Sequence, residues 1–261
     1  MEIGSLDFTH VMYLSAEAVA KSAFLGATAI GVHLSMLPPQ PKASERFQER
    51  FNASLTAFDD KSCSNVASPR FDYKAAIARF TVSYFPYIFL TWVVCMSTLD
   101  AIHALDLFPH IMPVSNTTTA QKINPQLIIG FILTTTSAAL RFAAFQTMGE
   151  LFTYQLAILP YHRLVTHGIY AYCRHPSYTA VPFIFAGVLL TTTAPGGVLY
   201  DYLGVDSTRK LMIVLAFAAA RGSYELMVRA EVEDKVLQKE FGKEWEEWAC
   251  KVPYRFIPYL F

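Results

Sequence analysis

Charged residues are scarce in this chain of 261 residues, where they make up 16%, while apolar residues make up 53%. Together with a positive mean hydropathy, this balance argues against an ordinary soluble domain and is typical of an integral membrane protein. The 21 basic residues equal the 21 acidic residues in number. Because the chain has no net charge to attract polyanions, we expect no nucleic-acid partner.

Cysteine is also rare, and its residues lie far apart, at Cys63, Cys95, Cys173 and Cys250. None of them forms a C-x-x-C pair, so the sequence predicts neither a disulfide framework nor a zinc site. The first ten residues, MEIGSLDFTH, contain no lysine or arginine. A cleaved secretory signal begins with a basic region, and we therefore expect this segment to be retained.

Five apolar segments are each long enough, at about 20 residues, to cross the hydrocarbon core of a bilayer. They lie at about residues 11–36, 75–99, 126–148, 178–200 and 211–228. The sequence thus predicts an all-α, polytopic membrane protein with about five transmembrane helices. The run Pro195-Gly196-Gly197 predicts a kink or a break in the fourth of them.

Three charged residues fall inside the first and third predicted spans. Glu17 and Lys21 are four residues apart, which predicts a local ion pair on one helix face; a functional intramembrane pair is the alternative. Arg141 lies near one end of its span, where a long side chain is expected to reach the membrane interface.

Basic residues predict how the spans are oriented. Residues 37–74 contain six lysines and arginines, whereas residues 100–124 contain only Lys122. Since cytoplasmic loops carry the excess of basic residues, we expect the first loop in the cytosol and the N-terminus in the lumen. Residues 149–177 and the C-terminal tail then lie on the cytosolic side.

The stretch from His162 to Tyr178, HRLVTHGIYAYCRHPSY, concentrates histidine and arginine around Gly168 and Pro176. Proline in the first turn of a helix leaves amide groups that point outward, and Arg174 and His175 lie beside it. This arrangement predicts a binding site for an anion. The alternative is an interfacial loop whose aromatic and basic side chains lie at the level of the lipid headgroups.

A row of charged residues begins in the fifth predicted span and continues beyond its end, with one charge every four positions: Arg221, Glu225, Arg229 and Glu233. Such spacing places them on one face of a helix. An alternating row is often a solvated, salt-bridged face. Here the row begins inside a membrane span, where charges are costly and tend to be functional, so we interpret it as part of a site.

The combination of these motifs resembles the isoprenylcysteine carboxyl methyltransferases of the endoplasmic reticulum. The run LVTHGIYAYCRHPSY is followed by Arg229-x-x-x-Glu233-Asp234-x-x-Leu237, and then by FGKEWEEW and VPYRFIP. The resemblance covers about residues 126–261. It implies a C-terminal catalytic region at residues 125–261, preceded at residues 1–124 by transmembrane helices and a cytosolic loop. Asp234 stands where this family more often has a second glutamate.

The resemblance implies that S-adenosyl-L-methionine is the cofactor, that no metal takes part, and that Arg229 and Glu233 are the catalytic residues. Arg229 is expected to bind the substrate carboxylate. The expected cofactor contacts are Gln155, His162, Arg163, Leu164, Val165, Tyr170, His175, Pro176, Ser177, Tyr178 and Glu233.

The implied activity is methylation of the C-terminal carboxylate of prenylated cysteine in proteins that undergo CaaX processing, which forms a methyl ester. The expected partners are farnesylated or geranylgeranylated protein C-termini and the lipid bilayer, and the expected location is the endoplasmic reticulum membrane with the catalytic side cytosolic. An NADPH-dependent sterol reductase, a phospholipid N-methyltransferase and a non-enzymatic membrane scaffold are the alternatives. The prenyl preference and the oligomeric state stay open.

Overall fold

The computed structural model describes residues 16–36, 73–105, 107, 122–152 and 161–260, with only the helical backbone given for residues 73–88. Within these ranges the chain forms helices and no β-strand, which confirms the predicted all-α class. The α-helices are α1 (Ala16–Met36), α3 (Tyr73–Ala104), α5 (Pro125–Met148), α6 (Pro176–Thr192), α7 (Val198–Phe241) and α8 (Lys243–Lys251). Two short 3-10 helices are η2 (Gly149–Leu151) and η3 (Gly168–Ala171).

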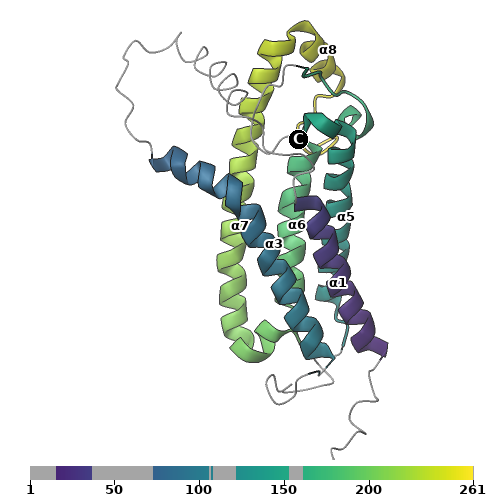
Figure 1. Ribbon diagram of the computed structural model, residues 1–261, viewed down its shortest axis with the longest axis vertical. Helices are drawn as coiled ribbons and strands as arrows, with labels where there is room; N and C mark the ends of the chain where they lie inside the picture. The colour runs from purple at the N-terminus through teal and green to yellow at the C-terminus, as the bar shows by residue number, and fades with distance from the viewer. Residues whose placement is uncertain (1–15, 37–72, 106, 108–121, 153–160, 261) are drawn as a thin grey trace, which may run out of the picture.

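The five longest helices lie side by side in one elongated bundle, and α7 extends beyond the others (Figure 1). In the described residues, α1, the stretch Pro125–Leu151 and α7 are long and apolar enough to cross a membrane. Phe89–Ala104 and α6 are shorter apolar helices. The protein is therefore a helical membrane protein, and each of the five predicted spans corresponds to a helix.

The boundary between the fourth and fifth predicted spans differs from the prediction. Helix α6 ends at Thr192 rather than near residue 200, and α7 already begins at Val198. Pro195 has no amide hydrogen to continue a helix, and Gly197 caps the next one. The predicted break is therefore present, and a second bend follows at Gly204, whose φ of 75° is non-helical.

Helices α5 and α6 approach closely because glycines face each other across their contact. A Cβ atom added at Gly130 would lie 2.8 Å from the carbonyl oxygen of Gly187, and one added at Gly187 would collide with Thr134. Small residues allow the backbones of membrane helices to approach in this way. This contact holds the later part of α6 close against α5.

A cluster of ionisable side chains lies at the lower end of the bundle in Figure 1, where α3 ends and α7 begins. This Lys21 cluster consists of Lys21, Asp100, His103 and Asp201. Lys21 Nζ donates to the carbonyl oxygen of Gly196 over 2.8 Å. Asp100 Oδ1 accepts from the amide of Val198 over 2.6 Å, and His103 Nε2 lies 2.9 Å from Asp201 Oδ2.

The Lys21 cluster corrects the prediction of a local pair between Glu17 and Lys21. Glu17 is exposed, whereas the Lys21 side chain is 1% exposed and points into the bundle. An ammonium group buried among helices needs acceptors, and the carbonyl of the α6–α7 turn supplies one. Helices α1 and α3 thereby hold the turn from which α7 starts.

Arg141 also differs from its prediction, because its side chain is buried between helices of the protein. It is 5% exposed and donates from Nε to the carbonyl oxygen of Ser35 over 2.7 Å. Its Nη1 donates to the Ser177 hydroxyl over 2.6 Å. In an apolar interior these acceptors satisfy the guanidinium group, so Arg141 ties the end of α1 to the beginning of α6.

Replacing Lys21 by methionine should destabilise the protein, because the buried carbonyl of Gly196 would lose the hydrogen bond that Lys21 Nζ donates to it. Leaving a buried acceptor without its donor typically lowers the free energy of unfolding by about 1–3 kcal/mol. Thermal unfolding in detergent micelles measures the effect. The matched control is Glu17→Gln, one turn away on the exposed face of α1. Equal midpoints for the two variants would contradict a structural role for the cluster.

Candidate functional site

Three segments that are far apart in the sequence meet at the end of the bundle opposite the Lys21 cluster. They are the stretch from His162 to Tyr178, the C-terminal third of α7 around Arg229 to Asp234, and the tail from Tyr254 to Phe256. The amide of Arg174 donates to the carbonyl of Tyr254 over 3.0 Å, and the amide of His175 to that of Arg255 over 2.8 Å. The tail thus runs along the backbone that leads into α6.

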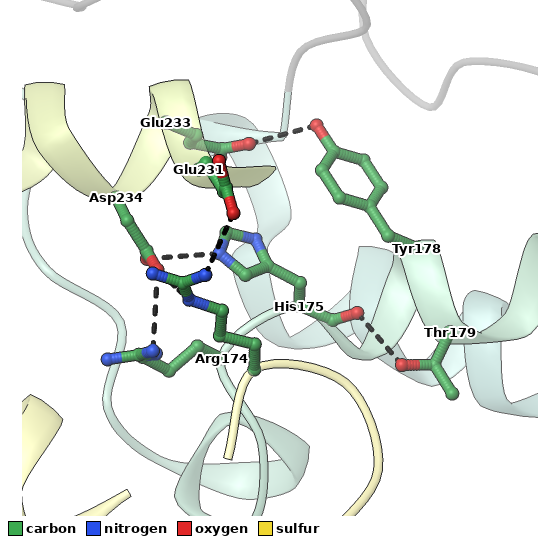
Figure 2. Close-up of polar contacts among 8 residues, drawn as sticks. Arg174, His175, Tyr178, Thr179, Glu231, Glu233 and Asp234 are labelled. Carbon is green, nitrogen blue, oxygen red and sulfur yellow. Dashed lines mark hydrogen bonds and ion pairs between the residues drawn. The ribbon is translucent and has the colours of Figure 1, made fainter. Parts of the chain in front are cut away.

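The Asp234 carboxylate is the centre of this site. Its Oδ1 lies 3.0 Å from His175 Nε2, and its Oδ2 lies 3.4 Å from Arg174 Nη2 and 3.3 Å from Arg255 Nε. Figure 2 shows Arg174 and His175 converging on Asp234. Asp234 is 4% exposed, so one anion from α7 faces three basic groups inside the protein.

This arrangement corrects the predicted anion site at the start of α6. Arg174 and His175 directly precede Pro176 as expected, but they pair with the chain's own Asp234 rather than facing an open site. Asp234 and Arg255 were not predicted as site residues. The signal for both was present, because Asp234 follows Glu233 directly and Arg255 lies in the motif VPYRFIP.

Tyr178 lies between the two charged residues of α7 that were predicted to act. Arg229 Nε donates to the Tyr178 hydroxyl oxygen over 2.8 Å, and that hydroxyl donates to Glu233 Oε2 over 2.9 Å. The Arg229 guanidinium carbon lies 5.8 Å from the centre of the Tyr178 ring. One tyrosine hydroxyl therefore links a cation and a carboxylate that lie one helical turn apart.

The charged row on α7 divides into two halves. Arg229 and Glu233 are half-buried and contact Tyr178. Arg221 and Glu225 form an ion pair with each other, with side chains 65% and 58% exposed. The first half of the row therefore matches the alternative of a local salt-bridged face, and only the second half takes part in the site.

His162 and Tyr170 border the same region from the loop. Burial lowers the pKa of His162, and the nearby carboxylates of Glu233 and Glu240 partly oppose this effect. The imidazole is therefore neutral at neutral pH. Its ring centre lies 5.9 Å from that of Phe241, and its buried Nδ1 has no hydrogen-bond partner among the described residues.

An apolar cluster packs against the stretch from His162 to Tyr178. Val165 and Tyr170 are buried in it with Trp248 and Val252, and Leu164 packs against it. The Trp248 indole donates to the Tyr170 carbonyl over 3.2 Å, and burial raises the pKa of the Tyr170 phenol, which keeps it protonated. These contacts attach α8 to the stretch from His162 to Tyr178 and shield Val165 and Tyr170 from water.

The structure thus brings some of the predicted site residues together and leaves others apart. His175, Tyr178, Arg229 and Glu233 meet at one place, and Pro176 and Ser177 are buried beside them. Val165 and Tyr170 belong to the apolar cluster, while Arg163 is exposed. Gln155 lies outside the described residues.

Comparison with known proteins finds a family that matches part of this site. Residues 128–203 match the Isoprenylcysteine carboxyl methyltransferase (ICMT) family, which confirms the resemblance seen in the sequence. This match includes His162 to Tyr178 and ends before Arg229.

Two plant proteins illustrate the likeness. The chain is 26% identical over 134 residues to the "Probable protein-S-isoprenylcysteine O-methyltransferase" of Oryza sativa subsp. japonica, which covers 51% of this chain and 61% of the relative. It is 29% identical over 116 residues to "Protein-S-isoprenylcysteine O-methyltransferase B" of Arabidopsis thaliana, 44% of this chain and 50% of the relative. The matched part therefore spans about half to three-fifths of these relatives.

Cys173 provides a chemical probe of the folded site. Burial raises the pKa of its thiol to about 11, and the thiolate is the form that reacts with alkylating reagents. In a variant that retains only Cys173, alkylation by iodoacetamide should be very slow at pH 8 and accelerate steadily up to about pH 11. A variant that retains only Cys250, which is exposed on α8, is the control. Equal rates at pH 8 would show that the loop is open.

Proposed function

Since residues 128–203 match the isoprenylcysteine carboxyl methyltransferase family, we propose that the protein methylates the C-terminal carboxylate of prenylated cysteine. One observation carries the proposal: Arg229 and Glu233 are held on either side of the Tyr178 hydroxyl, next to the stretch that matches the family. A cation for the carboxylate and an anion for a positively charged methyl donor thus lie within one site.

The residues fit S-adenosyl-L-methionine, which when bound supplies a methyl group on a positively charged sulfur. Glu233 offers a half-buried carboxylate, which accepts a hydrogen bond from the Tyr178 hydroxyl. His162 offers a buried ring nitrogen with no hydrogen-bond partner among the described residues, and it is neutral, so it does not repel a cation. We propose that His162 to Val165, Tyr170, His175 to Tyr178 and Glu233 hold the cofactor, together with Gln155.

Arg229 is proposed to bind the substrate carboxylate. A free α-carboxyl group has a pKa of about 3.5, so it is ionised at neutral pH and needs no general base. A guanidinium group binds a carboxylate through two parallel hydrogen bonds and stays charged when it is partly buried. The bond from Nε to the Tyr178 hydroxyl fixes the plane of this group. Arg229 is therefore oriented before the substrate arrives.

The surroundings of the site favour a reaction in which charge disappears. An anion and a cation combine to give neutral products, and a water-poor site lowers the barrier to such a step when the reactants are held in line. The apolar cluster of Val165, Tyr170, Trp248 and Val252 excludes water on the loop side. Here the protein contributes position and a low dielectric rather than proton transfer.

The membrane location follows from the proposed substrate. A prenyl chain gains about 0.8 kcal/mol for each methylene-sized unit buried in lipid, so its cysteine end is delivered at the bilayer surface. Large apolar side chains on α7 remain exposed, with Phe217 at 76% and Val214 at 64%, and they suit contact with lipid. We propose that the prenyl group enters sideways from the membrane and the cofactor from the cytosol, in the endoplasmic reticulum.

The test uses membranes that contain the protein, labelled S-adenosyl-L-methionine and N-acetyl-farnesylcysteine. The expected product is a base-labile methyl ester. Methylation of a phospholipid amine, or reduction of a sterol double bond with NADPH, would instead support one of the alternatives. Absence of any of these products would leave a non-enzymatic role.

Arg229→Ala should lower kcat/KM for N-acetyl-farnesylcysteine by about 100-fold or more, because two charge-assisted hydrogen bonds of about 1.5–3 kcal/mol each are lost. Binding of S-adenosylhomocysteine, followed by calorimetry, should be largely kept. Arg221→Ala is the matched control, since it removes an exposed arginine two turns earlier on the same helix. A similar loss in both variants would contradict a specific role for Arg229.

Glu233→Gln should mainly weaken cofactor binding, because the carboxylate charge beside the methyl donor is lost. We expect the KM for S-adenosyl-L-methionine to rise by about tenfold or more, the effect of one charged hydrogen bond, while the KM for N-acetyl-farnesylcysteine changes less. Glu225→Gln, one α7 turn before Arg229, should have little effect. Losses of equal size for both substrates would refute the division of roles between Arg229 and Glu233.

A further inference from the structure

Asp234 is a buried carboxylate that contacts three basic side chains. Its Oδ1 lies 3.0 Å from His175 Nε2. Its Oδ2 lies 3.3 Å from Arg255 Nε and 3.4 Å from Arg174 Nη2. Its side chain is 5% exposed. Burying a carboxylate is costly unless it is paired, and Arg174, His175 and Arg255 supply that pairing from the loop before α6 and from the tail.

The contact with Asp234 determines which ring nitrogen of His175 carries hydrogen. A carboxylate held between two guanidinium groups has only acceptor oxygens to offer. The 3.0 Å contact is therefore a hydrogen bond donated by Nε2. In the neutral imidazole, Nδ1 is then the acceptor. Figure 2 shows that Nδ1 lies on the side of the ring away from Asp234.

The orientation of the ring is fixed as well. His175 stacks on Tyr178 with ring centres 5.5 Å apart and an interplanar angle of 4°. Its backbone amide is bound by the tail at Arg255, and Thr179 donates to the Phe256 carbonyl over 2.8 Å. Asp234 thus holds the side chain of His175, and the tail holds its backbone, directly before α6 begins at Pro176.

We propose that Asp234 is a positioning residue for the cofactor half of the site. By accepting from His175 Nε2, it fixes the tautomer and direction of the imidazole, so that Nδ1 is presented as an acceptor to the methyl donor. Arg174 and Arg255 balance the carboxylate charge, so that the anion is kept in place without repelling Glu233. This inference rests on the proposed function, and it adds a residue that acts through His175 rather than by touching the cofactor.

The experiment compares purified full-length variants in detergent. Binding of S-adenosylhomocysteine is measured by calorimetry, and KM and kcat are measured with N-acetyl-farnesylcysteine. Asp234→Asn keeps the size of the side chain and removes its charge, and Asp234→Glu keeps the charge. The matched control is Glu231→Gln, one turn earlier, which removes only the exposed ion pair with Arg255.

Asp234→Asn should weaken S-adenosylhomocysteine binding about 10- to 100-fold, the effect of a hydrogen bond to a charged group. The KM for N-acetyl-farnesylcysteine should stay near that of the unaltered protein. Asp234→Glu should restore most of the affinity, and Glu231→Gln should leave both values unchanged. Unchanged binding in Asp234→Asn, or an equal loss for both ligands together with a lower melting temperature, would overturn the proposal.

A double-mutant cycle separates action through His175 from a general structural effect. If Asp234 acts through the imidazole, then Asp234→Asn should have almost no further effect on binding in a His175→Asn background. Additive losses would refute the proposal. If Asp234→Asn does not fold, His175→Asn alone carries the test, and it should lower S-adenosylhomocysteine affinity selectively.

The failure of this inference is distinct from failure of the proposed function. If the unaltered protein neither binds S-adenosylhomocysteine nor forms the ester, the proposed function is wrong, and the proposed role of Asp234 falls with it. If the unaltered protein does both and Asp234→Asn binds equally well, only the role of Asp234 is wrong.

Discussion

A charge buried in an apolar helix bundle must find its partner inside the protein, because lipid cannot solvate it. This constraint explains the organisation at both ends of the molecule. At one end, Lys21 binds the carbonyl of the α6–α7 turn, and Asp100 binds the first amide of α7. At the other end, Asp234 gathers three basic groups around the start of α6. Arg141 donates hydrogen bonds to the end of α1 and to the beginning of α6.

Helix α7 connects these two polar ends. It starts at the turn held by the Lys21 cluster, bends at Gly204 and continues to Phe241. Along this length its contacts change from buried ions through exposed apolar residues such as Phe217 to the pair formed with Tyr178. Helix α7 therefore runs from the turn that α1 and α3 hold to the residues that contact Tyr178 at the other end of the bundle.

Several features followed from the sequence because local chemistry decides them. The scarcity of charge and the long apolar runs predicted a helical membrane protein, and the Pro-Gly-Gly run predicted the break before α7. Motif spacing identified the stretch from His162 to Tyr178 and pointed to Arg229 and Glu233. The helix limits were less accurate, since the predicted fourth span extended through residues that the structure divides between a turn and α7.

The sequence alone therefore determined the fold class, the family resemblance and two of the buried charged residues, Lys21 and Arg141. Only the tertiary structure decided with which groups these charges pair. Spacing of four residues correctly predicts that Arg221 and Glu225 meet, but it equally predicts a pair between Glu17 and Lys21, which point apart. The partners of Lys21, Arg141 and Asp234 lie between 21 residues away, for Asp234 and Arg255, and 175 residues away, for Lys21 and Gly196. Such pairing depends on how helices pack, because desolvation favours whichever acceptor the fold brings within reach.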